Sequence, residues 1–210
     1  MQRIKAELNR LFTMKIHVGI QGGRSYDENG GEVDTPADLL TIAGVHEYGM
    51  TIKAKRAKNL AIPISPKSKD KRPADFPDLQ FFISEKGGKF LGRIKKGGKN
   101  RGEMEALFWL TPKVTIPERS FIRAGYDNGK STIAVATEKA LHAIIYDGWN
   151  ARRAADYIGM HAVKVVKGYV GNGNFEPKHG PTLAAYPGKT KPLIRSGRLR
   201  NSITYRIEEG

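Results

Sequence analysis

The segment Leu193-Ile-Arg-Ser-Gly-Arg-Leu-Arg-Asn-Ser-Ile-Thr-Tyr-Arg-Ile207 carries the clearest local structural signal of the chain. An apolar pair is followed by a small-residue turn at Ser196-Gly197, and serine is a residue type that caps helix N-termini with its side-chain oxygen. The Arg-rich residues after this turn predict a short helix. The alternation of Ile203, Tyr205 and Ile207 then predicts a strand with one apolar face.

Upstream, apolar periodicity predicts further helices and strands. The spacing of Ile4, Leu8, Leu11 and Phe12 predicts an amphipathic helix over residues 3–12, and residues 15–20 alternate like a strand. A second helix is expected to begin at Thr35-Pro36 and to end at Gly49. Residues 131–170 form the main helical region, in which residues 147–150 either separate two helices or lie within one long bent helix.

Shorter strands are predicted at residues 60–64, 106–110 and 114–116, with Phe108 and Trp109 buried. Helices and strands alternate without a regular βαβ rhythm. The predicted fold class is therefore α+β: a curved, mostly antiparallel sheet packed against one or two long helices. We expect residues 1–210 to form a single domain.

Two segments interrupt this pattern. Residues 65–105 are rich in Lys, Gly and Pro, with strand candidates at 79–84 and 89–94 and a turn at Lys86-Gly-Gly-Lys89 between them. We interpret this region as an inserted basic β-arm that forms little core of its own. Residues 171–192 contain four Gly and four Pro and are expected to form a long loop with little regular structure.

Composition limits the class of protein. The 210 residues are 39% hydrophobic, which is enough for a sizeable core, and there is no cysteine for a disulfide or a thiolate metal site. The first residues lack the apolar stretch of a signal peptide, and no stretch is long enough to suggest a membrane span. We therefore expect a protein that is made in a cytoplasm and has no membrane partner.

The net charge of +15 is concentrated in part of the chain. Residues 53–101 contain 15 Lys or Arg and 4 Asp or Glu, a net charge of +11, and residues 189–206 contain six basic residues and no acidic one. Such an imbalance indicates a polyanionic partner, an acidic protein surface or a solvated surface that maintains solubility. Basic clusters bind phosphate chains mostly without sequence preference.

No motif indicates catalysis. His46-Glu47 begins like the zinc motif HExxH, but Met50 occupies the position of the second histidine, so we assign the pair to packing and capping at a helix end. Residues 168–173 resemble a phosphate loop only in their glycine content, and no G-x-S-x-G sequence is present. We expect no enzymatic activity, no metal and no cofactor.

Three phrases together resemble a known family. Val45-His-Glu-Tyr-Gly49, Ile116-Pro-Glu-Arg-Ser-Phe-Ile-Arg123 and the segment 193–207 are similar, in this order, to sequences of the phage virion-morphogenesis family. This family comprises tail-completion, head–tail joining and neck proteins and related minor tail components. Glu118 and Ser120 stand where the family usually has Ala and Pro, and Arg195-Ser196 where it usually has Asp-Thr.

The resemblance implies a structural virion protein at the neck or tail of a phage or prophage, assembled in the cytoplasm of the bacterial host. It implies self-association, as a ring of about six subunits. The partners would be the head connector and tail tube or terminator proteins, with nonspecific contact to packaged DNA. Two other classes stay open: a minor tail protein of the same family, and a basic DNA-binding protein without sequence specificity.

Two groups of residues follow from these arguments. The residues expected to hold the fold belong to the three phrases: His46, Tyr48, Gly49, Pro117, Arg119, Phe121, Gly197, Leu199 and Ile203. The charges expected to face a partner or DNA are Lys53, Lys55, Arg56, Lys58, Lys95, Lys96, Lys99, Arg198 and Arg200.

Overall fold

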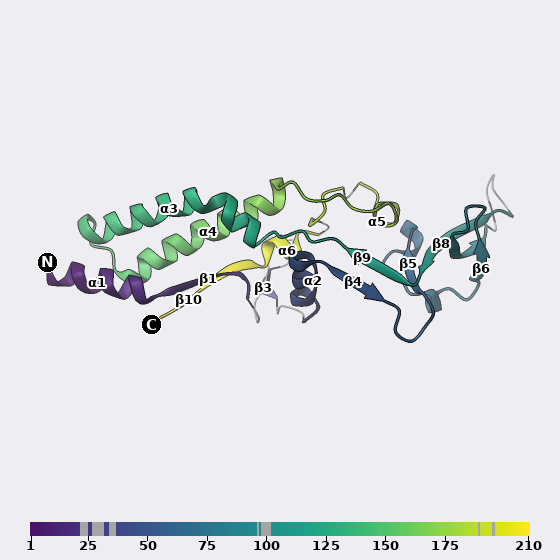
Figure 1. Ribbon diagram of the computed structural model, residues 1–210, viewed down its shortest axis with the longest axis horizontal. Helices are drawn as coiled ribbons and strands as arrows, with labels where there is room; N and C mark the ends of the chain where they lie inside the picture. The colour runs from purple at the N-terminus through teal and green to yellow at the C-terminus, as the bar shows by residue number, and fades with distance from the viewer. Residues whose placement is uncertain are drawn as a thin grey trace. The chain divides into compact units, whose positions relative to one another are not determined.

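The computed structural model describes residues 1–21, 25–26, 32–33, 37–95, 97, 102–188, 190–194 and 196–210 (Figure 1). It divides into two compact units. The first comprises Met1–Gly49, Glu118–Phe175 and Leu193–Gly210, and the second comprises Met50–Pro117 and Glu176–Pro192. The second unit contains the described part of the expected insertion 65–105, extends beyond it at both ends and includes most of the expected loop 171–192.

The α+β class is confirmed, and the described strands pair antiparallel. They form separate sheets, however, and not the single sheet expected from the sequence. In the first unit, β1 (Lys15–Ile20) pairs with β10 (Ile203–Glu208), and β2 (Ser25–Tyr26) pairs with β3 (Glu32–Val33). The helices of this unit are α1 (Gln2–Thr13), α2 (Ala37–Tyr48), α3 (Arg123–Tyr146), α4 (Ala151–Asn172) and α6 (Arg198–Asn201).

The long helical region consists of two helices, α3 and α4, which run side by side (Figure 1). Gly148 has a φ of 71°, a left-handed conformation that glycine adopts without strain and that ends α3. The Asn150 side chain accepts a hydrogen bond from the Arg153 amide (2.8 Å) and caps α4. The Glu7 carboxylate of α1 accepts a hydrogen bond from the Ala151 amide (2.7 Å), so a residue far away in the sequence also binds the first turn of α4.

Small residues allow α3 and α4 to approach closely. The buried residues of the two helices include Gly125, Gly129, Ala136, Ala140 and Ala143 on α3, and Ala151, Ala154, Ala155, Gly159 and Ala162 on α4. A Cβ atom at Gly129 would overlap the Val165 side chain, and one at Gly159 would overlap the Tyr205 ring. The Tyr205 hydroxyl donates to Asp156 (3.1 Å), which fastens β10 to α4.

The described residues of the first unit form two clusters of buried side chains. One contains Ala140, Ile144 and Ala154 with Leu11 of α1, while Phe12 is 74% exposed and does not join the predicted apolar face. Strand β1 follows the prediction, since Ile16 and Val18 are partly buried against these clusters and His17 is exposed.

The second unit is built on a four-stranded sheet in the order β5-β8-β7-β6. These strands are β5 (Leu60–Pro63), β6 (Gln80–Ile83), β7 (Lys89–Ile94) and β8 (Met104–Thr111), and β4 (Met50–Lys53) pairs with β9 (Lys113–Ile116) in a sheet of two. Two short 3₁₀ turns, Pro66–Ser68 and Pro73–Asp75, and α5 (Gly180–Ala185) complete it.

The second unit corrects three expectations from the sequence. The β6–β7 hairpin forms as predicted, but Phe76 of the expected arm is buried against Leu107 and Phe108 of β8, so the arm contributes to a core. Trp109 is only partly buried, and α5 lies within the segment expected to lack regular structure. The strand β4 was not predicted: Met50 and Ile52 alternate with polar residues over only four positions, and all four side chains are exposed.

The close α3–α4 contact makes a pair of matched substitutions informative. We predict that Gly129→Ala destabilises the protein by about 1–3 kcal/mol, because the added methyl group overlaps Val165. Gly168→Ala on α4 is the control, because no neighbouring atom lies within 4 Å of its added Cβ; it should stabilise by up to about 1 kcal/mol. Urea unfolding followed by circular dichroism measures both, and equal effects of the two changes would contradict the close packing.

Candidate functional site

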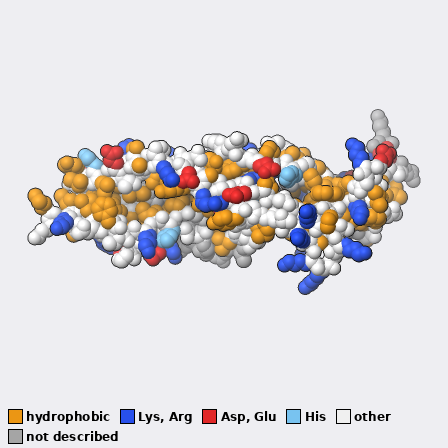
Figure 2. All heavy atoms as spheres, in the orientation of Figure 1, with side chains coloured by type: hydrophobic (Ala, Val, Ile, Leu, Met, Phe, Trp, Pro, Cys, Tyr) orange, Lys and Arg blue, Asp and Glu red, His pale blue; other side chains and the backbone are white. Residues whose placement is uncertain are grey.

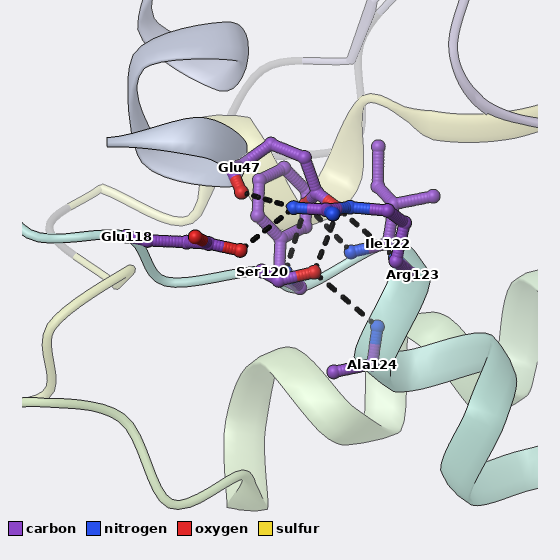
Figure 3. A network of polar contacts seen from close by, with 7 residues as sticks. Glu47, Glu118, Ser120, Ile122, Arg123 and Ala124 are labelled. Carbon is purple, nitrogen blue, oxygen red and sulfur yellow. Dashed lines mark hydrogen bonds and ion pairs between the residues drawn. The ribbon is translucent and has the colours of Figure 1, made fainter. Parts of the chain in front are cut away.

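A single carboxylate joins two of the three phrases singled out in the sequence. Glu47, in the last turn of α2, is 4% exposed and accepts hydrogen bonds from the amides of Phe121 (2.8 Å), Ile122 (2.9 Å) and Arg123 (3.0 Å) (Figure 3). The Ser120 hydroxyl donates a fourth, to Oε1 of Glu47 (2.8 Å). These amides lie at the start of α3, where backbone N–H groups have no partner within the helix.

Arg123 closes the network on its exposed side. Its Nε lies 3.0 Å from Oε1 of Glu47, and its Nη2 donates to the Glu47 carbonyl (2.9 Å) and to Glu118 (2.7 Å). The guanidinium also lies over the ring of Tyr48, 4.7 Å from the ring centre, which explains why this tyrosine can be 67% exposed and still contribute to the site.

Electrostatics favour the ionised form of Glu47. Burial by itself raises the pKa of a carboxyl group, but the hydrogen bonds from the amides of Ile122 and Arg123, from Ser120 and from the Phe121 amide outweigh it and lower the pKa of Glu47 below its usual value. The carboxylate also lies at the positive end of the α3 dipole. The site is therefore a buried anion held by a helix N-terminus of the same chain.

His46 and Arg119 form a second contact between the same two phrases. The Arg119 amide donates to the His46 carbonyl (2.7 Å), and the Arg119 side chain is 6% exposed. Burial, and then the charge of Arg119, lowers the pKa of the His46 imidazole. His46 is thus held neutral next to a buried cation, and Gly49, with a φ of 69°, ends α2 directly after the network.

The third phrase packs on the core beneath this network. Leu193, Leu199 and Ile203 belong to one buried cluster with Phe121 and with two residues of α2, Leu39 and Ala43. Gly197 has a φ of 83° and occupies the N-cap position of α6, so the expectation that Ser196 caps this helix is wrong. Apart from Ile116 and Pro117, which belong to the second unit, the described residues of all three phrases therefore lie in the first unit, and most of the predicted fold residues belong to this arrangement.

Sequence reasoning missed the central residue of the site. Glu47 was assigned with His46 to a helix end, and no pattern in the sequence joined it to the start of α3 at Arg123. The available signal was that α3 has no acidic residue in its first turn and no side-chain cap from its own N-cap residue, Ile122. The first amides of such a helix are open to a cap from another part of the chain.

The predicted interface charges divide into several groups. Lys53, Lys55, Arg56 and Lys58 are exposed, and no ion pair joins them to an acidic side chain in the described part of the chain. Lys95 is paired with Glu103 (3.3 Å), whereas Lys96 and Lys99 lie outside the described residues. In the first unit Arg198 is exposed, and Nε of Arg200 donates to the Lys167 carbonyl (3.0 Å).

Lys and Arg side chains gather over the second unit on the face seen in Figure 2, where acidic side chains are fewer. A hollow of about 370 Å³ in this unit is lined by charges of both signs that are largely paired, because Glu105 binds Lys67 (2.7 Å) and Arg93 (3.4 Å). The exposed group Lys53–Lys58 is therefore the better candidate for contact with an anionic partner.

Other kinds of site find no support in the described residues. They contain no group of three or more His, Asp or Glu side chains placed to bind a metal ion. No described helix is long and apolar enough to cross a membrane. Comparison of the chain with protein-family models, with curated proteins and with solved structures finds no match.

The Glu47 network predicts that substitutions of two acidic residues change the free energy of unfolding by very different amounts. Glu47→Gln keeps the size of the side chain but removes the charge and replaces one acceptor with a donor, so we expect a loss of about 2–4 kcal/mol in the free energy of unfolding. Glu118→Gln alters an exposed ion pair with the same Arg123, and it should change the free energy of unfolding by less than about 0.5 kcal/mol. Urea unfolding measures both, and a Glu47→Gln protein as stable as Glu118→Gln would contradict the assigned role.

Proposed function

We propose that this chain is a non-enzymatic structural protein of a tailed phage or prophage. It acts in tail completion or head–tail joining at the neck of the virion and assembles as an oligomeric ring. Its partners are further copies of itself, the head connector and the tail tube or terminator proteins. This proposal rests on the resemblance of three phrases to the phage virion-morphogenesis family.

One observation carries the proposal beyond that resemblance. The phrases lie at residues 45–49, 116–123 and 193–207, yet they meet at the Glu47 network and in the cluster around Phe121. Segments that are far apart in the sequence but make mutually supportive contacts at one centre are expected to belong to the same fold. The two residues at this centre that differ from the family sequence are compatible with the same structural role. The Ser120 hydroxyl accepts a hydrogen bond from the Ala124 amide at the start of α3 (3.4 Å), and Glu118 pairs with Arg123.

The charge distribution supports a role in assembly. The exposed residues Lys53, Lys55, Arg56 and Lys58 would attract an acidic partner surface or the phosphates of packaged DNA without reading its sequence. The same charges favour the alternative of a nonspecific DNA-binding protein, and a minor tail protein of the same family is the other alternative. The two structural roles differ in the particle defect that loss of the protein would cause.

Deletion of the gene from its phage or prophage, followed by electron microscopy of the induced lysate, tests the proposal. We expect DNA-filled heads that lie apart from tails of normal length, because a joining or completion protein acts after both are built. A plasmid copy of the gene should restore infectious particles, which controls for effects on neighbouring genes. Missing or malformed tails would favour the minor tail protein. Infectious particles of normal appearance would contradict a virion role and leave the DNA-binding alternative.

A further inference from the structure

The four-stranded sheet of the second unit ends in two edge strands of different character. The strand β5 contains Pro63, which has no N–H to offer a further strand, and α5 packs against it. The other edge, β6, has the sequence Gln80-Phe-Phe-Ile83, without proline or charge. Soluble proteins usually protect such an edge with charged residues, proline or a covering element, and an unprotected apolar edge favours pairing with another chain.

The backbone groups of β6 that face away from the sheet can be assigned. The Ser84 amide donates to the Gly88 carbonyl (2.9 Å), which closes the β6–β7 hairpin. Bonded and non-bonded positions alternate along an antiparallel pair, so Gln80 and Phe82 direct their backbone groups toward β7. The N–H and C=O groups of Phe81 and Ile83 consequently point outward, where a further strand would bind.

The apolar side chains of the sheet also continue to this edge. The strand register places Phe108, Leu91 and Phe81 in one cross-strand row, in which Phe108 is fully buried and Phe81 is 56% exposed. Ile83, on the same face, is 58% exposed. Phe82, on the other face, is stacked on Phe90 at 5.6 Å and lies against Gly92. The core row of the sheet thus extends to the edge and is exposed there.

Charge indicates what can cover this edge. Residues 78–89 contain two acidic residues, Asp78 and Glu85, and two basic residues, Lys86 and Lys89, so the segment is neutral within a strongly basic region. A neutral, apolar edge does not attract a polyanion, and it does not repel a second copy of the same basic protein. These properties favour self-association.

We propose that β6 pairs antiparallel with β6 of a second copy about a two-fold axis at Phe82. Opposed residues in such a pair point to the same face, so Phe81 lies opposite Ile83 of the second copy, and Gln80 lies opposite Ser84. The outward backbone groups of Phe81 and Ile83 bond to each other reciprocally, and each apolar row gains a neighbour from the other copy. The two sheets then form one continuous sheet across the interface.

This interface goes beyond the proposed virion role and does not depend on it. It also limits the assembly, because a ring in which each β6 is paired in this way contains an even number of subunits. The two claims can fail separately, since the pairing is measured on the purified protein and the virion role in the phage.

Sedimentation equilibrium of the purified full chain tests the pairing. We expect a mass twice the 23.2 kDa of one chain, or an even multiple of it. Ile83→Lys places a charge at the centre of the interface and should at least halve the mass. The control is Val135→Lys, which places the same charge at a residue of similar exposure (50%) on α3 and should leave the mass unchanged. A monomeric wild-type chain, or equal masses for the two variants, would overturn the proposal.

Cysteine crosslinking tests the register without disrupting the apolar contacts, because the chain has no cysteine of its own. Opposed non-bonded residues have Cα atoms about 4.5 Å apart, within the range of a disulfide. Gln80→Cys and Ser84→Cys proteins should therefore crosslink when they are mixed under mild oxidation, and neither should crosslink with itself. Crosslinking of either variant alone to the same extent as the mixture, or no crosslinking of the mixture, would overturn the two-fold register.

Discussion

The arrangement of the first unit depends on the carboxylate of Glu47. Placing a charged group in a buried position costs several kcal/mol unless hydrogen bonds and an opposite charge compensate for it. Here three consecutive amides, a hydroxyl and a guanidinium supply that compensation, and the amides come from the start of α3, where they would otherwise have no partner. Each side of the contact therefore requires the other, and the end of α2 is fixed to the beginning of α3.

The remaining elements of the unit build on that junction. The amide of Phe121 binds Glu47 while its ring is fully buried among residues of α2, α4 and the C-terminal segment, so one residue links the polar network to the core. From this start α3 runs along α4, and Gly129 permits their close approach. Strand β10 is then held against α4 by Tyr205, whose ring occupies the space left by Gly159.

Local features of this structure were predictable from the sequence, and long-range ones were not. The alternation of residues 15–20, the end of α2 at Gly49 and the β6–β7 hairpin follow from the pattern of a few adjacent residues. The Glu47 contacts join residues 74 to 76 positions apart, so no periodicity reveals them. The core of the second unit was predicted only in part: the burial of Phe108 was expected, whereas that of Phe76 was not, because Phe76 lies in a segment rich in Lys, Gly and Pro whose composition suggested an arm without a core.

The most direct test of the central claim is amide hydrogen exchange at Phe121, Ile122 and Arg123 in the intact protein. If Glu47 holds the start of α3, these amides exchange as slowly as those in the middle of α3 and α4, because they are released only when the unit unfolds. In the Glu47→Gln protein the protection of these three amides should fall further than that of the middle of both helices, which falls only with the stability of the unit. Rapid exchange of the three amides in the wild-type protein, with the rest of α3 protected, would show that the start of the helix frays and would contradict the account.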